Sequence, residues 1–269
     1  MKKALNMRIS FCSNSSVLKA FNHGQFHYYI DPYNGNKGSL SYFSNSHPNS
    51  RYCDAIKIHR DIGTKLRKEL EEIPPQTIFI GYNTEPYQPL EDSLHQTRIV
   101  LELLHEKGFS VNLFTMSDLV KRDIDLLKRM PDSKICMPLF SADDDLSDLF
   151  ERNTSRIEHR FQTLREIKAQ GVRTSVKIGP IIPKISDPKT VISKIKGITD
   201  EIELTALSFK DKRGEDWIRF EEILYKNYLK SAEEIETIIF SKDHVYWLEL
   251  KVELEEYRKD HNLNLSVNF

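Results

Sequence analysis

Short apolar runs alternate with amphipathic segments along most of this chain. The runs are rich in β-branched and aromatic residues, which favour strands, and they cover residues 26–30, 54–58, 77–81, 111–115, 135–140, 173–178 and 201–207. Apolar residues at helical spacing predict helices at residues 62–73, 92–107, 119–130, 157–170 and 189–196. This alternation indicates βαβ crossovers and a parallel sheet. About five or six such units fall short of the eight in a closed barrel, so the pattern predicts an α/β fold, a partial (β/α)6-type open barrel of parallel strands.

The periodicity changes after residue 210. Charged helical patterns cover residues 216–228, 231–237 and 248–261, and the run Val245–Leu248 has the composition of a strand. No linker-like composition separates this part from the preceding one. We therefore predict an N-terminal extension over residues 1–25, the barrel over residues 26–210, and a mainly helical C-terminal cap of the same domain over residues 211–269.

Composition narrows the class of protein. The chain has 269 residues, 29% of them charged, and a net charge of -1, which gives no electrostatic signature of a nucleic-acid binder. Nucleic acid therefore remains a candidate partner without support from charge. Cys12, Cys53 and Cys136 are too far apart in the sequence for a disulfide framework or a thiolate metal motif. With no apolar run of membrane-spanning length, we expect a reduced, cytoplasmic protein that does not enter a membrane.

The stretch Gly81–Glu91 directly follows the predicted strand at 77–81. It places several polar side chains around two prolines, Pro86 and Pro89, and proline fixes the backbone angle φ. In parallel α/β folds, ligands bind at the loops that follow the strands. This loop is therefore the first candidate for a binding site.

Several spaced motifs together resemble one enzyme family. They are Thr84-Glu-Pro-Tyr-Gln-Pro89, Thr97-Arg98, Thr115-Met-Ser-Asp-Leu-Val120 with Arg122-Asp-Ile-Asp-Leu-Leu127, and Gly179-Pro-Ile-Ile-Pro183. In this order they resemble the spore photoproduct lyase-like branch of the radical S-adenosylmethionine (SAM) enzymes, over about residues 29–207. The resemblance implies a partial α/β barrel and a [4Fe-4S] cluster that binds SAM and generates a 5′-deoxyadenosyl radical.

The cluster motif of that family is altered here. The family pattern is Asn-Pro-Tyr-x-Gly-Cys-x-His-x-Cys-x-Tyr-Cys, and this chain retains Pro32, Tyr33, Gly35 and Tyr42. The three cysteine positions, however, hold Asn36, Leu40 and Phe43. Cluster irons need thiolate or comparable donors, which leucine and phenylalanine cannot supply. A conventional cluster is therefore not expected at this site, and no other metal site is predicted. Convergence of Cys12, Cys53 and Cys136 on a substitute site is conceivable, but three unrelated thiols explain them better.

Other family positions are also changed. Met116 replaces the lysine of a Thr-Lys-Ser motif, and Tyr82 stands near the position where the lyase has a hydrogen-donating cysteine. Retained polar residues form our set of ligand-binding candidates: Glu85, Tyr87, Gln88, Ser117, Glu151, Arg160 and Lys177. Each also has a structural explanation, such as a charge at a helix start or a turn contact. We expect these residues to gather at one barrel mouth, and no catalytic residue is assigned.

The leading hypothesis is a degenerate radical-SAM-fold protein, a pseudoenzyme without the cluster, that binds a ligand or a partner. The ligand would be nucleotide-like, and SAM itself remains a candidate even though no cofactor is required. A second hypothesis is an active radical SAM or other enzyme that uses an unconventional site in the same pocket, with nucleic acid as a candidate substrate. A third is an accessory subunit of a cluster-bearing enzyme, docked through the charged C-terminal helices. Ligand, partner and oligomeric state are not encoded in any motif of this sequence.

Overall fold

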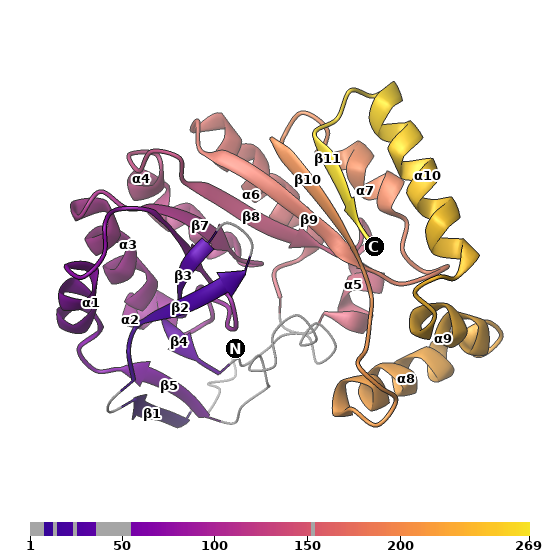
Figure 1. Ribbon diagram of the computed structural model, residues 1–269, viewed down its shortest axis with the longest axis horizontal. Helices are drawn as coiled ribbons and strands as arrows, with labels where there is room; N and C mark the ends of the chain where they lie inside the picture. The colour runs from indigo at the N-terminus through magenta and orange to yellow at the C-terminus, as the bar shows by residue number, and fades with distance from the viewer. Residues whose placement is uncertain (1–7, 13–14, 24–25, 36–54, 152–153) are drawn as a thin grey trace, which may run out of the picture. The chain divides into compact units, whose positions relative to one another are not determined.

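The structure is a computed structural model that describes residues 8–12, 15–23, 26–35, 55–151 and 154–269. The chain divides into two compact units, and the division in the described part falls between Ile135 and Cys136. Strand β8 (Lys134–Leu139) contains this division. Each unit is an arrangement of strands and helices in its own right, and together they make a mixed α/β fold with mostly parallel strands (Figure 1).

The first unit holds the elements that precede β8. Its strands are β1 (Arg8–Cys12), β2 (Leu18–His23), β3 (Phe26–Ile30), β4 (Tyr33–Asn34), β5 (Ala55–His59), β6 (Thr77–Ile80) and β7 (Ser110–Phe114). Its helices are α1 (Ile62–Leu70), α2 (Glu91–Leu94), α3 (Gln96–Glu106), the 3-10 helix η2 (Asp118–Asp123) and α4 (Ile124–Leu127).

The main sheet of the first unit runs in the order β2, β3, β6, β7. Strands β3, β6 and β7 are parallel, and β2 pairs with β3 in the antiparallel sense. The register aligns Ile30 with Ile80 and Ile80 with Leu113, and all three side chains are buried. Helix α3 packs on β7 and against α1, so the apolar residues of α3 and of this sheet share one core. A second, small sheet pairs β1 and β4 with β5.

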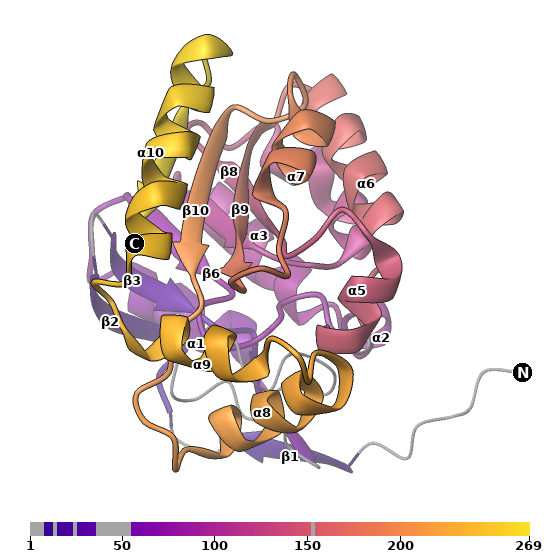
Figure 2. The same ribbon diagram turned by 90° about the vertical axis from the view of Figure 1, so that its right-hand side faces the viewer.

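The second unit continues the alternation of strands and helices. Its elements are α5 (Asp144–Phe150), α6 (Ile157–Ala169), β9 (Arg173–Ile181), α7 (Pro188–Ile195), β10 (Glu201–Ala206), α8 (Glu215–Asn227), α9 (Ala232–Phe240), α10 (Val245–Asp260) and β11 (Leu265–Asn268). Strands β9, β10 and β11 are parallel neighbours. Helices α6 and α7 pack against β9, and α10 packs against β11 (Figure 2).

The prediction of an α/β fold with parallel strands is confirmed at this level. The finer prediction of a partial (β/α)6-type barrel remains a prediction, as do the domain boundaries after residues 25 and 210. Within the part predicted as an N-terminal extension, two strands are described, β1 and β2. The predicted helix at 119–130 is a 3-10 helix, η2, followed by the short α4.

One prediction in the C-terminal part was wrong. Residues Val245–Leu248 begin helix α10 and do not form a strand. The His244 ring caps this helix by accepting a hydrogen bond from the Tyr246 N–H, and the buried Trp247 donates its indole N–H to the Ile238 carbonyl. These tertiary contacts override the local β-propensity. The strand of this region is instead β11, which extends the sheet beside β10.

Candidate functional site

The loop after β6 starts with a turn that only glycine fits. Gly81 has φ of +87°, and a Cβ on this residue would stand 2.4 Å from the Phe114 carbonyl oxygen. The loop is then fastened to the end of β3. Asp31 accepts hydrogen bonds from the Asn83 backbone N–H (3.0 Å) and from the Asn83 side-chain amide (2.7 Å). Burial raises the pKa of the Asp31 carboxyl, while its bonds from Asn83 act in the opposite direction.

Glu85 connects this loop to the end of β7. One carboxylate oxygen accepts hydrogen bonds from the Tyr87 N–H (2.8 Å) and the Thr115 hydroxyl. The other accepts the Met116 N–H at 2.9 Å. Both oxygens of this predicted ligand-binding residue are therefore used to hold two loops together.

Tyr87 and Gln88 are buried within the first unit. The Tyr87 hydroxyl donates to Asp123 at 2.9 Å, and burial, with the Asp123 charge beside it, raises the Tyr87 pKa well above its usual range. Gln88 donates to the Gly35 carbonyl at 3.3 Å. Its side-chain carbonyl oxygen is buried and has no hydrogen-bond partner within the described part of the chain. Gln88 thus retains an unused acceptor, whereas Tyr87 does not present its hydroxyl to solvent.

A second carboxylate, Glu91, organises the segment beyond the loop. It is fully buried and accepts the Tyr33 hydroxyl and the Thr97 N–H on one oxygen, and Arg122 and the Arg98 N–H on the other. The carboxylate therefore satisfies two backbone donors at the start of α3. Burial and the Glu91 carboxylate raise the Tyr33 pKa above its usual range.

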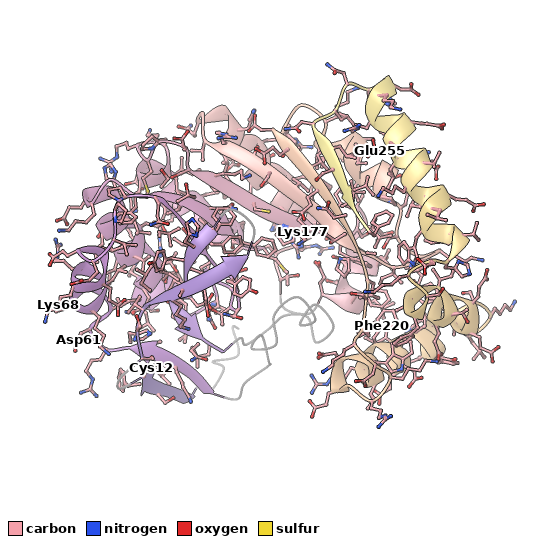
Figure 3. The ribbon with its side chains drawn as sticks, in the orientation of Figure 1. Cys12, Asp61, Lys68, Lys177, Phe220 and Glu255 are labelled. Carbon is pink, nitrogen blue, oxygen red and sulfur yellow. The ribbon has the colours of Figure 1, made fainter. Side chains whose placement is uncertain are left out.

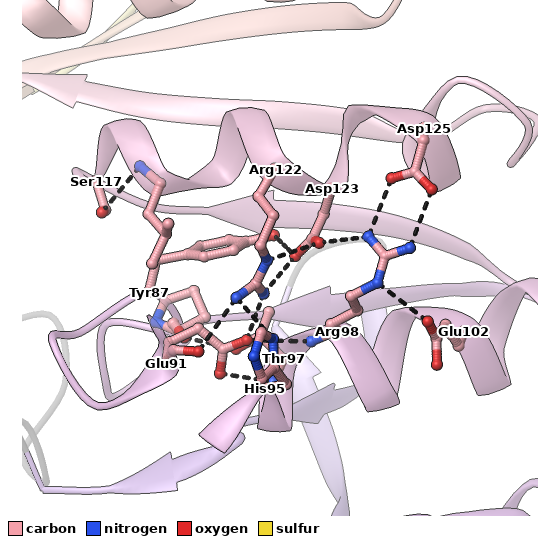
Figure 4. Close-up of polar contacts among 12 residues, drawn as sticks. Tyr87, Glu91, His95, Thr97, Arg98, Glu102, Ser117, Arg122, Asp123 and Asp125 are labelled. Atoms are coloured by element: carbon pink, nitrogen blue, oxygen red, sulfur yellow. Dashed lines mark hydrogen bonds and ion pairs between the residues drawn. The ribbon is translucent and has the colours of Figure 1, made fainter. Parts of the chain in front are cut away.

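Arginines extend this network to the 3-10 helix (Figure 4). Arg122 bonds Glu91 at 2.5 Å and Asp123 at 2.8 Å. Arg98 bonds the buried Asp123 at 2.8 Å and Asp125 at 3.0 Å. The motif residues Thr97-Arg98 and Arg122-Asp123 thus belong to one structural network that fixes the loop after β6.

Ser117 lies at the start of η2. Its hydroxyl accepts the Leu119 N–H at 3.3 Å, so it caps this short helix. The Ser117 N–H in turn donates to the Thr115 hydroxyl, which bonds Glu85. Ser117 and Glu85 are therefore brought close together through Thr115, as expected of residues at neighbouring strand ends.

Glu151 and Arg160 form a buried ion pair in the second unit. Their side chains have no exposed surface, and the Arg160 guanidinium is 2.6 Å from Glu151. Arg160 also donates to the Ser155 and Pro138 carbonyls, and Ser147 donates its hydroxyl to Glu151 at 3.0 Å. One Glu151 oxygen is buried and finds no hydrogen-bond partner in the ranges that the structure describes. The pair joins the end of α5, strand β8 and helix α6.

Lys177 lies on β9 (Figure 3) and is half-buried. Its ammonium is 3.9 Å from Glu203, its register partner on β10, and Asn268 of β11 donates to the same carboxylate at 3.0 Å. Lys177 is thus part of a cross-strand polar row in the second unit. The gathering of all seven candidates at one barrel mouth remains a prediction, because four lie in the first unit and three in the second.

Asn36, Leu40 and Phe43, which the resemblance aligns with the family's cluster cysteines, lie outside the described residues, as does Cys53. Cys12 on β1 (Figure 3) belongs to the first unit and Cys136 on β8 to the second. Within the described ranges, no group of three or more His, Cys, Asp or Glu side chains is arranged to hold a metal ion. Asn36, Leu40 and Phe43 carry no thiolate, so these side chains do not fit a [4Fe-4S] cluster.

One face of the first unit's sheet carries side chains that were not foreseen as functional. Tyr29, Phe79 and Asn112 are register partners on β3, β6 and β7, and they alternate with the buried residues described above. The alternation in Val111-Asn-Leu-Phe already places Asn112 on the opposite face from Val111 and Leu113. That pattern was a usable signal for this row.

The fold of this chain is similar to those of several solved structures. A structure of spore photoproduct lyase with a bound dinucleoside spore photoproduct superimposes with a TM-score of 0.63 at 11% identity, covering 97% of this chain and 82% of that one. A second, with AdoMet and the dinucleoside, gives 0.60 at 13% identity, covering 100% and 80%. SuiB of Streptococcus suis gives 0.57 at 12% identity, covering 90% and 49%.

Two relatives found by sequence similarity are uncharacterized proteins. An uncharacterized protein of Methanocaldococcus jannaschii is 27% identical over 156 residues, 58% of each chain. An uncharacterized protein of Mycobacterium tuberculosis is 22% identical over 186 residues, 64% of this chain and 54% of that protein. This chain therefore spans little more than half the length of these relatives.

A radical SAM Nalpha-GlyT isomerase of Pseudomonas phage M6 is 26% identical over 133 residues, 48% of this chain and 27% of that protein. No known family profile matches the chain. In the described ranges, no helix has the length and apolar character needed to cross a membrane. The structural likeness shows the fold alone, and that fold is similar to the folds of spore photoproduct lyase and SuiB.

Proposed function

We propose that this protein is a degenerate member of the radical SAM fold that binds a ligand without assembling the family's [4Fe-4S] cluster. The observation that carries the proposal is the replacement of all three cysteines, by Asn36, Leu40 and Phe43, inside a frame that keeps Pro32 and Tyr33. A cluster bound through three thiolates has no donors at these positions. The radical chemistry that depends on such a cluster is accordingly absent.

The contacts of the first unit support a scaffold that does not need the cluster. Tyr33, from the altered motif, donates to Glu91, and Glu91 in turn holds Arg122 and the start of α3. Glu85 joins the loop after β6 to the end of β7. These bonds explain why residues around the family's motifs are retained in a chain that lacks the cysteines.

The ligand we propose contains a nucleoside. Solved structures with this fold hold AdoMet and a dinucleoside, and parallel α/β folds bind ligands at the ends of their strands. The loop after β6 stands at such an end, and Gln88 keeps a buried acceptor there. Fold likeness alone does not identify the ligand.

The test is a measurement of iron and acid-labile sulfide after reconstitution without oxygen. The wild-type chain should contain no stoichiometric cluster. A triple variant, Asn36→Cys, Leu40→Cys and Phe43→Cys, restores the thiolate donors and should acquire iron and sulfide in a 1:1 ratio on the same scaffold.

The control for this experiment is a cysteine-free variant that carries Cys12→Ser, Cys53→Ser and Cys136→Ser and keeps Asn36, Leu40 and Phe43. If the wild type binds a cluster and this cysteine-free variant loses it, the remaining cysteines provide an unconventional site. The proposal would then be wrong, and the protein would be a candidate active enzyme.

A further inference from the structure

A row of four side chains crosses the sheet of the first unit on one face. The row consists of Lys19 on β2, Tyr29 on β3, Phe79 on β6 and Asn112 on β7. Each residue is the register partner of the next, so the four side chains point to the same side of the sheet. Three strand spacings separate its ends, a span of about 14 Å. We call this set the cross-strand row.

Asn112 is the least expected member of the cross-strand row. Its side chain is only 9% exposed, and its side-chain carbonyl oxygen has no hydrogen-bond partner among the residues that the structure describes. A buried polar atom without a partner destabilises a fold by roughly 1–3 kcal/mol. A hydrophobic residue at this position would remove that cost, so a stability role does not explain the asparagine. The Asn112 side-chain oxygen is therefore an acceptor for which the described residues supply no donor.

Aromatic rings line the middle of the same face. The Tyr29 and Tyr82 ring centroids are 5.0 Å apart, those of Phe79 and Tyr82 are 6.0 Å apart, and those of Phe79 and Phe114 are 6.4 Å apart. All four side chains are half-buried. Such rings offer planar, polarizable surface on which a flat heterocycle stacks, with each stacked base contributing about 1–3 kcal/mol.

Lys19 gives the other end of the row a positive charge. Its ammonium lies 5.5 Å from the Tyr29 ring centroid. The Lys19 charge lowers the pKa of the nearby Asp31, but the Asp31 oxygens accept their hydrogen bonds from Asn83. Within the described ranges, no carboxylate lies within ion-pair distance of Lys19. The ammonium can therefore attract an anionic group held beside the rings.

We propose that the cross-strand row binds a nucleotide whose amino-substituted base donates to Asn112, stacks on Phe79 and Tyr29, and directs its phosphate towards Lys19. Asparagine is a common partner of adenine because its amide matches an adjacent donor and acceptor on the base edge. A cation at the far end favours a phosphate over the positively charged sulfonium of SAM. This inference rests on the proposed function, because it names the ligand class of the same scaffold.

The experiment is calorimetric titration of the purified full chain with AMP, adenosine and a short oligodeoxyadenylate. We expect AMP to bind more tightly than adenosine, because only AMP carries the phosphate. A free nucleotide as the natural ligand predicts that AMP and the oligonucleotide bind equally per site, whereas a single strand as the ligand predicts tighter binding of the oligonucleotide.

Three variants test the row residue by residue. Asn112→Leu should raise the Kd for AMP about tenfold without lowering the unfolding midpoint, because it removes an orphan acceptor. Lys19→Ala should raise the Kd for AMP but not that for adenosine. Phe79→Leu should raise both. Thr163→Val, which removes another buried orphan hydroxyl in the second unit, is the matched control and should leave every Kd unchanged.

Absence of binding by both AMP and the oligonucleotide would overturn the inference, as would an unchanged Kd in Asn112→Leu. Iron analysis of the same preparation separates this failure from a failure of the proposed function. If the protein contains no cluster, does not bind AMP and binds SAM, the nucleotide inference is wrong and the proposed function still stands. If it contains a stoichiometric cluster, the proposed function itself is wrong.

Discussion

Single carboxylates decide how the loop after β6 is held. Glu85 was predicted as a ligand-binding residue, yet both of its oxygens accept hydrogen bonds from neighbouring segments of the chain. Asp31 binds Asn83 in the same manner. Carboxylates whose oxygens are taken up in this way hold loops in place, so we do not expect them to contact a ligand directly. The side chains with unused polar atoms, Gln88 and Asn112, are better candidates for direct contact.

Gly81 gives a stability prediction at this scale. Gly81→Ala should destabilise the protein by about 3 kcal/mol or more, because the new Cβ meets the Phe114 carbonyl and the backbone has positive φ. Gly108→Ala is the matched control: its φ is +75°, but a Cβ there would meet no atom within 4 Å, so about 1 kcal/mol is expected. Urea unfolding of the two variants measures the difference, and equal losses would contradict the steric explanation.

His59 gives a pH prediction. Burial lowers its pKa, and Lys65 and Lys19 lower it further, whereas Glu69 acts in the opposite direction. As pH falls below the ordinary histidine pKa of 6.5, His59 becomes protonated in the unfolded chain. In the folded chain it stays neutral until the pH reaches its lower folded-state pKa, so protonation favours unfolding in between. The contribution of His59 to the free energy of unfolding is therefore fully present above pH 6.5 and is lost as pH falls through this window.

The measurement is urea unfolding at a pH of about 7.5 and about 5.5. His59→Leu should show a smaller drop between the two conditions than the wild type. His27→Asn, a change at an exposed histidine of the same unit, should keep the wild-type drop. An unchanged drop in His59→Leu would show that other groups produce the pH dependence.

At the scale of elements, local pattern predicted the strands β3, β5, β6 and β7 within a residue or two, because alternating or continuous apolar runs survive in the folded sheet. It did not predict the break at His95, which has φ of 52° and separates α2 from α3. The cause is a tertiary contact: the Glu91 carboxylate caps α3 from outside the helix. Sequence spacing cannot reveal a cap supplied by a residue from the preceding helix.

The candidate site was predicted only in part from the sequence, again because contacts between separate segments are not visible in sequence spacing. Motif spacing pointed to the loop that carries Glu85 and Tyr87, and the structure explains these residues by their contacts within the chain. A charge at a helix start was one structural explanation considered for such residues, but Glu151 lies at the end of α5 and forms a buried ion pair with Arg160. Asn112 was not foreseen because the alternation of the strand gives the face on which it lies, but not whether its side-chain oxygen has a hydrogen-bond donor.

Removing the cap tests its role. Glu91→Gln should lower the free energy of unfolding by about 3 kcal/mol, since one partner of a buried charge pair is lost and Arg122 remains. Glu102→Gln, at the exposed end of an ion pair with Arg98 on the same helix, should change it by less than about 1 kcal/mol. Chemical denaturation compares the two, and a cost for Glu91→Gln no larger than that for Glu102→Gln would exclude a capping role.

For the whole molecule, the net charge does not indicate which charged residues stabilise the fold or attract a ligand. The net charge of -1 is the balance of 39 basic and 40 acidic side chains, many of which form exposed pairs such as Arg67 with Glu106, where solvent screens the attraction. The charges that fix the fold are few and buried: Glu91 and Asp123 in the first unit, and Glu151 with Arg160 in the second. A near-neutral chain therefore leaves room for a local anion-attracting position such as Lys19.

The Glu91 carboxylate also sets the timescale on which part of the backbone opens. Amide protons in the first turn of a helix normally exchange quickly with solvent, because the end of a helix frays independently. Here the Thr97 and Arg98 amides bond a carboxylate that also holds Tyr33 and Arg122. Releasing these two protons requires the separation of segments distant in the chain. Their hydrogen exchange should accordingly follow the collective unfolding of the first unit, and the start of α3 should be among its slowest-exchanging helix ends.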